Sequence, residues 1–199
     1  MLFGAVLLSL ALSLFAYNQR QASEAGKASA ELMPQLMEQI NAHEQTREDS
    51  EPEAQPVGTP IEHLDPSVFQ MAETVIGGHA YIGYLSIPKL ELELPIMSDW
   101  DFMKLHTAPC RYHGSLRGED LVIMAHNYDY HFGNLSKLEA GDSVIFTDVE
   151  GVSTAYTVVA QDILDSFAVE EMTAGEYDLT LFTCTYGGQS RVTVYCDFA

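Results

Sequence analysis

Leu179-Thr-Leu-Phe-Thr-Cys184 and Arg191-Val-Thr-Val-Tyr-Cys-Asp-Phe198 are two runs of β-forming residues that flank the turn sequence Thr185-Tyr-Gly-Gly-Gln-Ser190. This pattern predicts an antiparallel hairpin. Side chains alternate along a strand, so each run has an aliphatic face, and we expect these two faces to pack into the core. Cys184 and Arg191 then lie side by side on the opposite face, at the mouth of the turn, roughly 5 Å apart at Cβ.

A cysteine beside a guanidinium is more easily converted to its thiolate, which is the form that acts as a nucleophile. The spacing alone is equally compatible with a small strand residue next to a solvated arginine. A second candidate comes from Leu121-Val-Ile-Met-Ala125, a short apolar run that predicts a buried strand ending at His126. An imidazole titrates near neutral pH, so His126 suits proton transfer to a leaving amine.

The Thr-Leu-Phe-Thr-Cys184 element with Arg191 after it, and His126-Asn127 upstream, resembles the sortase family. The resemblance extends from about Tyr81 to Ala199. It implies a membrane-anchored cysteine transpeptidase of Gram-positive bacteria, built on a closed eight-stranded β-barrel. It also implies that Cys184, His126 and Arg191 are the catalytic three.

Two neighbours of this set are open to more than one interpretation. Asn127 could orient His126, as an asparagine does in other cysteine enzymes. Adjacent residues on an extended chain point in opposite directions, however, so a turn role is favoured for Asn127. Thr183 precedes the nucleophile and lies on the core-facing side of its strand. A structural role and an oxyanion-binding role are equally compatible with its position.

The remaining pattern of the domain agrees with a mainly β fold with short helices. Strands are predicted at Tyr81–Ile87, Leu90–Leu94, Ser143–Thr147 and Thr154–Val159. In the second of these the strict alternation puts Glu91 and Glu93 towards water. Short strands and frequent turn signals argue for a barrel or a sandwich, and the resemblance narrows this to the barrel, over residues 77–199.

Residues 1–17 contain no charge and no proline, and as a helix they would span about 26 Å. A transmembrane anchor, a cleaved signal peptide and a buried helix are the alternatives. The run lacks a small-x-small cleavage site and a basic region before it, so we predict the anchor. A single-pass protein of the cell membrane with its catalytic domain outside the cell is what the resemblance implies.

Residues 18–76 are predicted to be a tether, first helical and then acidic and disordered. Apolar residues at spacings of three and four predict a helix over 18–41, which Pro34 should kink or divide. Residues 42–65 are acidic and rich in proline, and we expect them to remain solvated. Asp65-Pro66 resembles the lid motif of pilin-polymerising sortases, although Ser67 stands where an aromatic residue is expected.

Composition excludes some functions. There are 9 Lys and Arg against 29 Asp and Glu, a formal net charge of −20. Such a chain lacks the cationic surface that nucleic-acid binding needs. Three cysteines are too few for a disulfide scaffold and leave room for a reactive thiol.

A metal site is the rival chemistry. His106, Cys110 and His113 have a spacing suited to zinc, with His126 or His131 as a fourth ligand. Ala108-Pro109 breaks a helix there and no second cysteine cluster follows, so we predict no metal and no cofactor.

The predicted function is therefore cleavage of an LPXTG-like sorting signal on a surface protein. A thioacyl-enzyme would then pass the acyl group to an amine of the cell wall. Polymerisation of pilins, with a pilin lysine as the acceptor, is the alternative within the family. A catalytically silent extracellular barrel that serves binding or assembly is the alternative outside enzymology. Detection of an acyl adduct on Cys184 separates the silent barrel from the enzyme.

Overall fold

The computed structural model describes residues 2–48 and 70–199. A long helix, α1 (Leu2–Glu48), precedes a domain made almost entirely of strands. The strands are β1 (Thr74–Ile76), β2 (His79–Ile87), β3 (Leu92–Met97), β4 (Cys110–His113), β5 (Leu121–Ala125), β6 (Ser143–Asp148), β7 (Ser153–Asp165), β8 (Leu179–Cys184) and β9 (Ser190–Phe198). The short helices are η3 (Pro88–Leu90), η4 (Lys104–His106), η5 (Leu135–Lys137) and α2 (Val169–Met172).

Eight of the strands form a closed barrel, as predicted. They follow the order β2-β3-β4-β5-β8-β9-β7-β6, and a β2–β6 pairing closes the ring. β1 pairs with the first residues of β2, where Thr74 lies opposite Tyr81. The β-sheet therefore begins earlier than the predicted boundary at residue 77, because a hairpin over Gly77-Gly78 joins β1 to β2.

Gly83 allows β2 to pair with β3 on one side and with β6 on the other. The pairing of β2 with β3 slips between Tyr81 and Gly83, which is a β-bulge. The φ of Gly83 is +147°, and a Cβ at this position would overlap the Thr147 carbonyl oxygen of β6. A glycine is therefore required where β2 meets β6 at the closure of the barrel.

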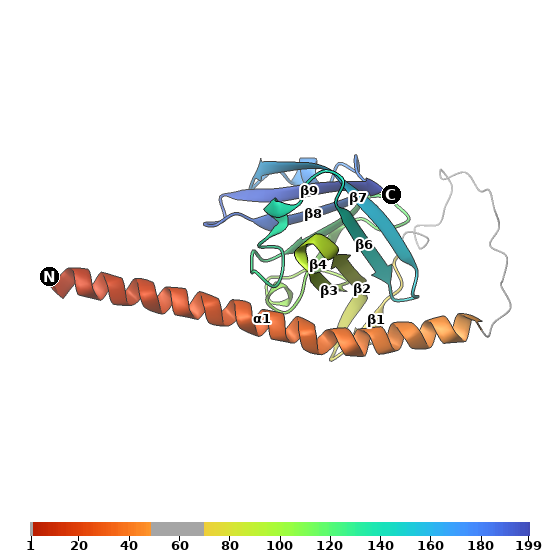
Figure 1. Cartoon of the computed structure of the whole chain (residues 1–199), viewed down its shortest axis with the longest axis horizontal. Coiled ribbons are helices and arrows are strands. Elements are labelled where there is room, and N and C mark those ends of the chain that lie inside the picture. Colours follow the sequence, from red (N-terminus) through yellow and green to blue (C-terminus); the bar gives the residue numbers. More distant parts are fainter. Residues whose placement is uncertain (1, 49–69) are drawn as a thin grey trace.

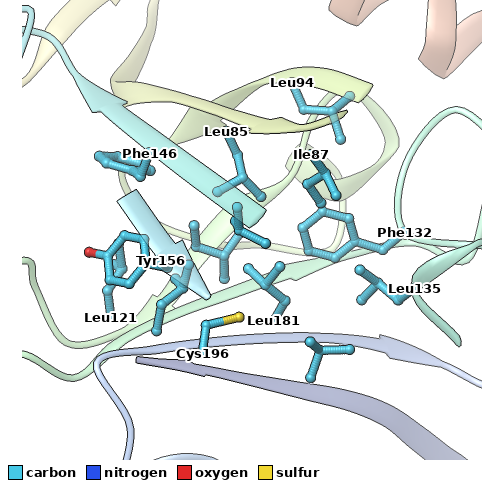
Figure 2. Packing of buried hydrophobic residues seen from close by; sticks show 14 of the residues in the cluster. Leu85, Ile87, Leu94, Leu121, Phe132, Leu135, Phe146, Tyr156, Leu181 and Cys196 are labelled. Atoms are coloured by element: carbon cyan, nitrogen blue, oxygen red, sulfur yellow. The ribbon is translucent and has the colours of Figure 1, made fainter. Parts of the chain in front are cut away.

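The interior of the barrel is filled by aliphatic and aromatic side chains from seven of its strands and from the segment around η5 (Figure 2). The predicted hairpin contributes Leu179 and Leu181 from β8 and Val194 and Cys196 from β9, as its alternation indicates. Phe198 differs, since it is 45% exposed at the end of β9, where it stacks on Tyr156.

One predicted strand begins later than its alternation indicates. Pro88–Leu90 is the 3-10 helix η3, with the proline at its start, and Glu91 N–H donates to the Pro88 carbonyl at 3.0 Å. Glu91 then adopts a left-handed φ of 54°, so the strand β3 starts only at Leu92. The strand predicted over Leu90–Leu94 was therefore wrong at its start, because the turn after Pro88 takes its first two residues.

The helix predicted over 18–41 is confirmed as part of α1, which runs through Pro34 without being divided. Figure 1 shows α1 passing along one side of the barrel, with its N-terminal end extending beyond it. Leu36 and Ile40 of α1 pack on a second buried cluster outside the barrel, with Tyr81, Met97 and Leu105 among its members. This packing holds α1 to the barrel on the C-terminal side of the proline.

Residues 42–48, predicted to be part of the solvated linker, also belong to α1. The rest of the acidic stretch and the Asp65-Pro66-Ser67 motif lie outside the described residues.

Within the part of the chain that the structure describes, no helix combines the length and the apolarity needed to cross a membrane. The transmembrane anchor predicted over residues 1–17 is not supported by this finding. The apolar run continues directly into Asn18-Gln-Arg20 of the same helix.

Candidate active site

The hairpin of β8 and β9 brings Cys184 directly opposite Arg191, in register. The turn between them is closed by the Thr185 N–H, which donates to the Ser190 carbonyl at 2.9 Å. The Arg191 guanidinium donates to two carbonyls of this turn, Gly188 at 3.0 Å and Ser190 at 3.1 Å. The cation is thereby tied to the end of the hairpin that carries Cys184.

His126 reaches the same edge of the sheet from a different strand. β5 runs parallel to β8, and their last paired residues are Ala125 and Thr183. The next residues along the chain are His126, directly after β5, and Cys184, the last residue of β8, so the two emerge side by side at the carboxyl ends of neighbouring strands. The sequence predicted both strand ends, and the parallel pairing brings them together.

Thr183 locks this arrangement. Its hydroxyl donates to the Ala125 carbonyl at 2.8 Å, and the side chain is buried on the core-facing side of β8. The hydrogen bond joins β8 to β5 one residue before the cysteine and one residue before the histidine. This geometry favours the structural alternative for the Thr183 side chain over oxyanion binding.

Asn127 begins a compact turn after His126. The Phe132 N–H donates to the His126 carbonyl at 3.2 Å, and the Gly133 N–H donates to the Tyr128 carbonyl at 2.9 Å. A Cβ on Gly133 would lie 2.7 Å from the Asn127 carbonyl oxygen, so the turn requires a glycine there. This position favours the turn role that the sequence indicates for Asn127.

The imidazole of His126 is surrounded by rings rather than by polar partners. His106 lies 4.7 Å away between ring centroids, Tyr128 lies 4.9 Å away, and Phe102 meets His126 edge-on at 6.2 Å. We call these four residues the His126 ring cluster. The His126 Nε2 atom is buried and has no hydrogen-bond partner among the described residues.

Burial, and to a smaller extent the neighbouring His106, together lower the pKa of His126 to about 4. A buried imidazole loses the hydration that stabilises its charged form, and a second imidazolium beside it repels that charge. At neutral pH the His126 side chain is therefore a neutral base in the free protein.

The two other cysteines lie in apolar surroundings. Cys196 is inside the barrel and Cys110 is in the cluster between α1 and the barrel, and burial raises the pKa of each thiol to about 12. Only Cys184 of the three is partly accessible, and all three are free thiols. The surroundings thus single out Cys184 as the candidate nucleophile.

The zinc alternative finds no support in this geometry. The three proposed ligands have different surroundings. Cys110 is fully buried, the Nε2 atom of His113 lies 3.8 Å from the Oδ2 atom of Asp120, and His106 belongs to the His126 ring cluster. Across residues 2–48 and 70–199, no three His, Cys, Asp or Glu side chains gather in a way that could hold a metal ion.

Three members of the His126 ring cluster were missed by the sequence analysis as parts of the site: Phe102, His106 and Tyr128. Phe102 and His106 come from the β3–β4 connection, and nothing in their local pattern points to His126. Tyr128 carries a visible signal, because Asn127-Tyr-Asp-Tyr-His-Phe132 is unusually aromatic for a segment that follows a buried strand.

Residues 85–199, more than half of the chain, match the sortase domain family. The chain therefore belongs to the sortase family, whose members are cysteine transpeptidases. No curated protein sequence matches the chain.

Solved sortases of several classes share the fold. Sortase C1 from Streptococcus suis is 28% identical, with a TM-score of 0.55, over 61% of this chain and 74% of that one. A sortase D5 transpeptidase from Clostridium perfringens is 17% identical, with a TM-score of 0.58, over 89% and 99%. Sortase A from Corynebacterium diphtheriae is 20% identical, with a TM-score of 0.55, over 94% and 95%. The likeness spans three classes and does not select one.

Proposed function

We propose that this sortase cleaves an LPXTG-like sorting signal through a thioacyl-enzyme on Cys184 and transfers the acyl group to an amine of the cell wall. The observation that carries the proposal is the meeting of three elements at one edge of the barrel. Cys184 ends β8, His126 follows the parallel strand β5, and Arg191 is the register partner of Cys184 on β9.

In the proposed reaction the neutral His126 imidazole accepts the proton of the Cys184 thiol. The sulfur attacks the carbonyl carbon of the scissile peptide bond and forms a tetrahedral oxyanion. His126 then gives its proton to the leaving amine, the C–N bond breaks, and a thioester remains on Cys184. An incoming amine then attacks the thioester carbonyl and loses a proton to His126. The C–S bond breaks, the new amide is released, and His126 returns the proton to the Cys184 sulfur.

We assign to Arg191 the stabilisation of the negative charge that develops on the carbonyl oxygen of the substrate. A fixed cation near the carbonyl oxygen stabilises the tetrahedral intermediate more than the ground state, and removal of such a group costs roughly a hundredfold or more in rate. The hydrogen bonds from Arg191 to the Gly188 and Ser190 carbonyls keep the guanidinium at this end of the hairpin before substrate arrives.

A pilin-polymerising activity, with a lysine amine as the acceptor, is the second candidate. The 28% identity to a sortase C1 favours it, since that class contributes several of the structures similar to this chain. The two activities share the thioacyl step and differ only in the amine that attacks it.

We also propose that the enzyme acts outside the cell, at the cell membrane, where proteins with sorting signals meet cell-wall precursors. This location rests on the family resemblance. Accessibility of the catalytic domain to a protease added to intact cells is the measurement that checks it.

Incubation of the protein with a panel of sorting-signal peptides, with and without amines, tests the function by mass spectrometry. We expect an acyl adduct on Cys184, and a product joined to the added amine. Amines that mimic cell-wall precursors and amines that mimic a pilin lysine separate the two activities. Cys184→Ala should reduce turnover to background, whereas Cys110→Ser serves as the control for a cysteine outside the site. Full turnover in Cys184→Ala would exclude the proposed nucleophile.

A further inference from the structure

We propose that His106 is a positioning residue for His126: it packs against the imidazole and, held by Tyr128, fixes the orientation in which His126 faces Cys184. The inference rests on the proposed role of His126 in proton transfer. It starts from the observation that the His126 Nε2 atom has no hydrogen-bond partner among the described residues.

A catalytic histidine needs a third group to hold its ring. In other cysteine enzymes that group is a hydrogen-bond acceptor such as the amide of an asparagine. Here Asn127 lies in the turn after His126, and no hydrogen bond from its side chain to His126 occurs within the described part of the chain. The neighbours of the imidazole are rings: His106 at 4.7 Å with an interplanar angle of 41°, and Tyr128 at 4.9 Å and 38°.

His106 is itself held rigidly. It ends η4, whose start is fixed by the Asp101 carboxylate, which accepts from the Met103 N–H at 2.7 Å and the Lys104 N–H at 2.8 Å. Leu105, next to His106, is buried in the cluster between α1 and the barrel. The backbone of η4 therefore presents His106 from a fixed position.

Tyr128 completes the support from a second loop. Its hydroxyl and the Nδ1 atom of His106 share a hydrogen bond of 3.1 Å. The two residues come from different loops, and both rings contact His126. Phe102 closes the cluster by meeting His106 edge-on at 5.4 Å. The orientation of the His106 ring is thus set by one hydrogen bond and by packing, and that of His126 is set by the rings.

The same contacts make His106 an electrostatic neighbour of His126. The titratable and charged groups around His126 are His106 on η4, Tyr128 and His131 in the loop after β5, Cys184 on β8 and Arg191 on β9. A protonated His106 disfavours a second positive charge on His126. Removing the His106 charge should therefore raise the pH at which His126 titrates, while removing the ring should misplace the imidazole.

Two substitutions separate these effects. His106→Ala removes the ring, and kcat should fall roughly tenfold to a hundredfold while KM stays within about twofold of the wild-type value. The reason is that displacement of a catalytic group by about 1 Å lowers the rate by up to about a hundredfold. His106→Phe restores the ring, held by packing, without the charge and without the hydrogen bond to Tyr128. It should recover kcat to within about threefold, with the acid limb of the kcat/KM profile moved to higher pH. His113→Ala, at the far end of β4, is the matched control.

A pH titration of the His126 ring signal by NMR gives a readout that needs no turnover. In His106→Phe the signal should titrate at higher pH than in the wild type, and in His113→Ala it should not move. Wild-type kcat and an unmoved pH profile in His106→Ala would overturn the inference. So would equal losses in the Ala and Phe variants with an unchanged NMR titration, since that outcome describes a merely structural residue. A wild-type protein that transfers no acyl group would instead overturn the proposed function, and the NMR titration would still decide the role of His106.

Discussion

The interior of the barrel and the seam between α1 and the barrel are both buried, but they are assembled from different kinds of contact. The interior is lined by alternate residues of strands that are hydrogen-bonded to one another all around the ring. The seam is made by Leu36 and Ile40 of α1 lying on outward-facing side chains such as Tyr81 and Met97. Successive residues of β3, Ile96 and Met97, serve the interior and the seam respectively.

This difference matters for the active site. The strand ends that carry Cys184 and His126 are positioned by the ladder of the barrel. The loops that surround His126 are instead held partly by the seam. Ser29 of α1 donates to the Thr107 carbonyl at 3.1 Å and shares a 3.3 Å hydrogen bond with Nε2 of His131. Gly26 leaves room for the Tyr130 ring, since a Cβ there would lie 2.7 Å from it.

Removal of α1 should have the largest effect. A protein that begins at Gln70 loses Leu36 and Ile40, which are almost fully buried, at about 1.5–3 kcal/mol each. We expect the free energy of unfolding to fall by roughly 5 kcal/mol, with increased binding of a hydrophobic dye to the uncovered Tyr81, Met97 and Leu105. Denaturant unfolding followed by circular dichroism measures the first effect.

A protein that begins at Asn18 is the matched control, because it keeps the packed part of α1 and removes the N-terminal segment, of which residues 4–17 are exposed along the helix. It should unfold at the denaturant concentration of the full chain. If the Gln70 protein did so too, the seam would contribute nothing to stability, and the comparison of the two clusters would be mistaken.

A pair of leucine truncations compares the clusters directly. Leu181→Ala inside the barrel should lower the free energy of unfolding by about 4 kcal/mol, because the closed ladder prevents the strands from collapsing into the cavity. Leu36→Ala in the seam should lower it by about 3 kcal/mol, because a helix held by side chains can shift towards the gap. Both residues are fully buried, so burial alone predicts equal effects. A larger loss for Leu36→Ala would contradict the expected rigidity of the barrel.

The seam should also make stability depend on pH. Burial, and to a smaller extent His126, together lower the pKa of His131 to about 4. In the unfolded chain the pKa is about 6.5, so between these values the unfolded state binds a proton that the folded state does not. The stabilisation is complete above pH 6.5 and is lost as pH falls towards 4. The loss is at most about 3 kcal/mol for this group.

Urea unfolding at pH 7.5, 5.5 and 4.5 measures this effect. His131→Gln keeps an amide near the position of Nε2, facing Ser29, and removes the titration. Its stability should fall less than that of the wild type over this pH range. If the free energy of unfolding fell equally with pH in the two proteins, His131 would be protonated equally in the folded and unfolded chains.

The sequence predicted the parts of the fold that depend on neighbouring residues. The alternation in Leu179–Cys184 and Arg191–Phe198 identifies the hairpin, its core face and the pairing of Cys184 with Arg191, because a two-residue period and a glycine turn are local properties. The same holds for the apolar run that becomes β5. The start of β3 was missed because the η3 turn after Pro88 overrides an equally clear alternation in Leu90–Leu94.

What the sequence determined by itself is thus seven of the eight barrel strands, the hairpin and the three candidate residues Cys184, His126 and Arg191; β4 was not predicted. The tertiary structure decided which of them meet, since the parallel pairing of β5 with β8 joins segments far apart in the chain. It alone also decided the docking of α1 through Leu36 and Ile40, and the gathering of Phe102, His106 and Tyr128 around His126. The apolar spacing along α1 predicts a helix face but not the surface that covers it, and the ring contacts leave no periodic pattern, because each depends on loops and faces brought together only when the barrel closes.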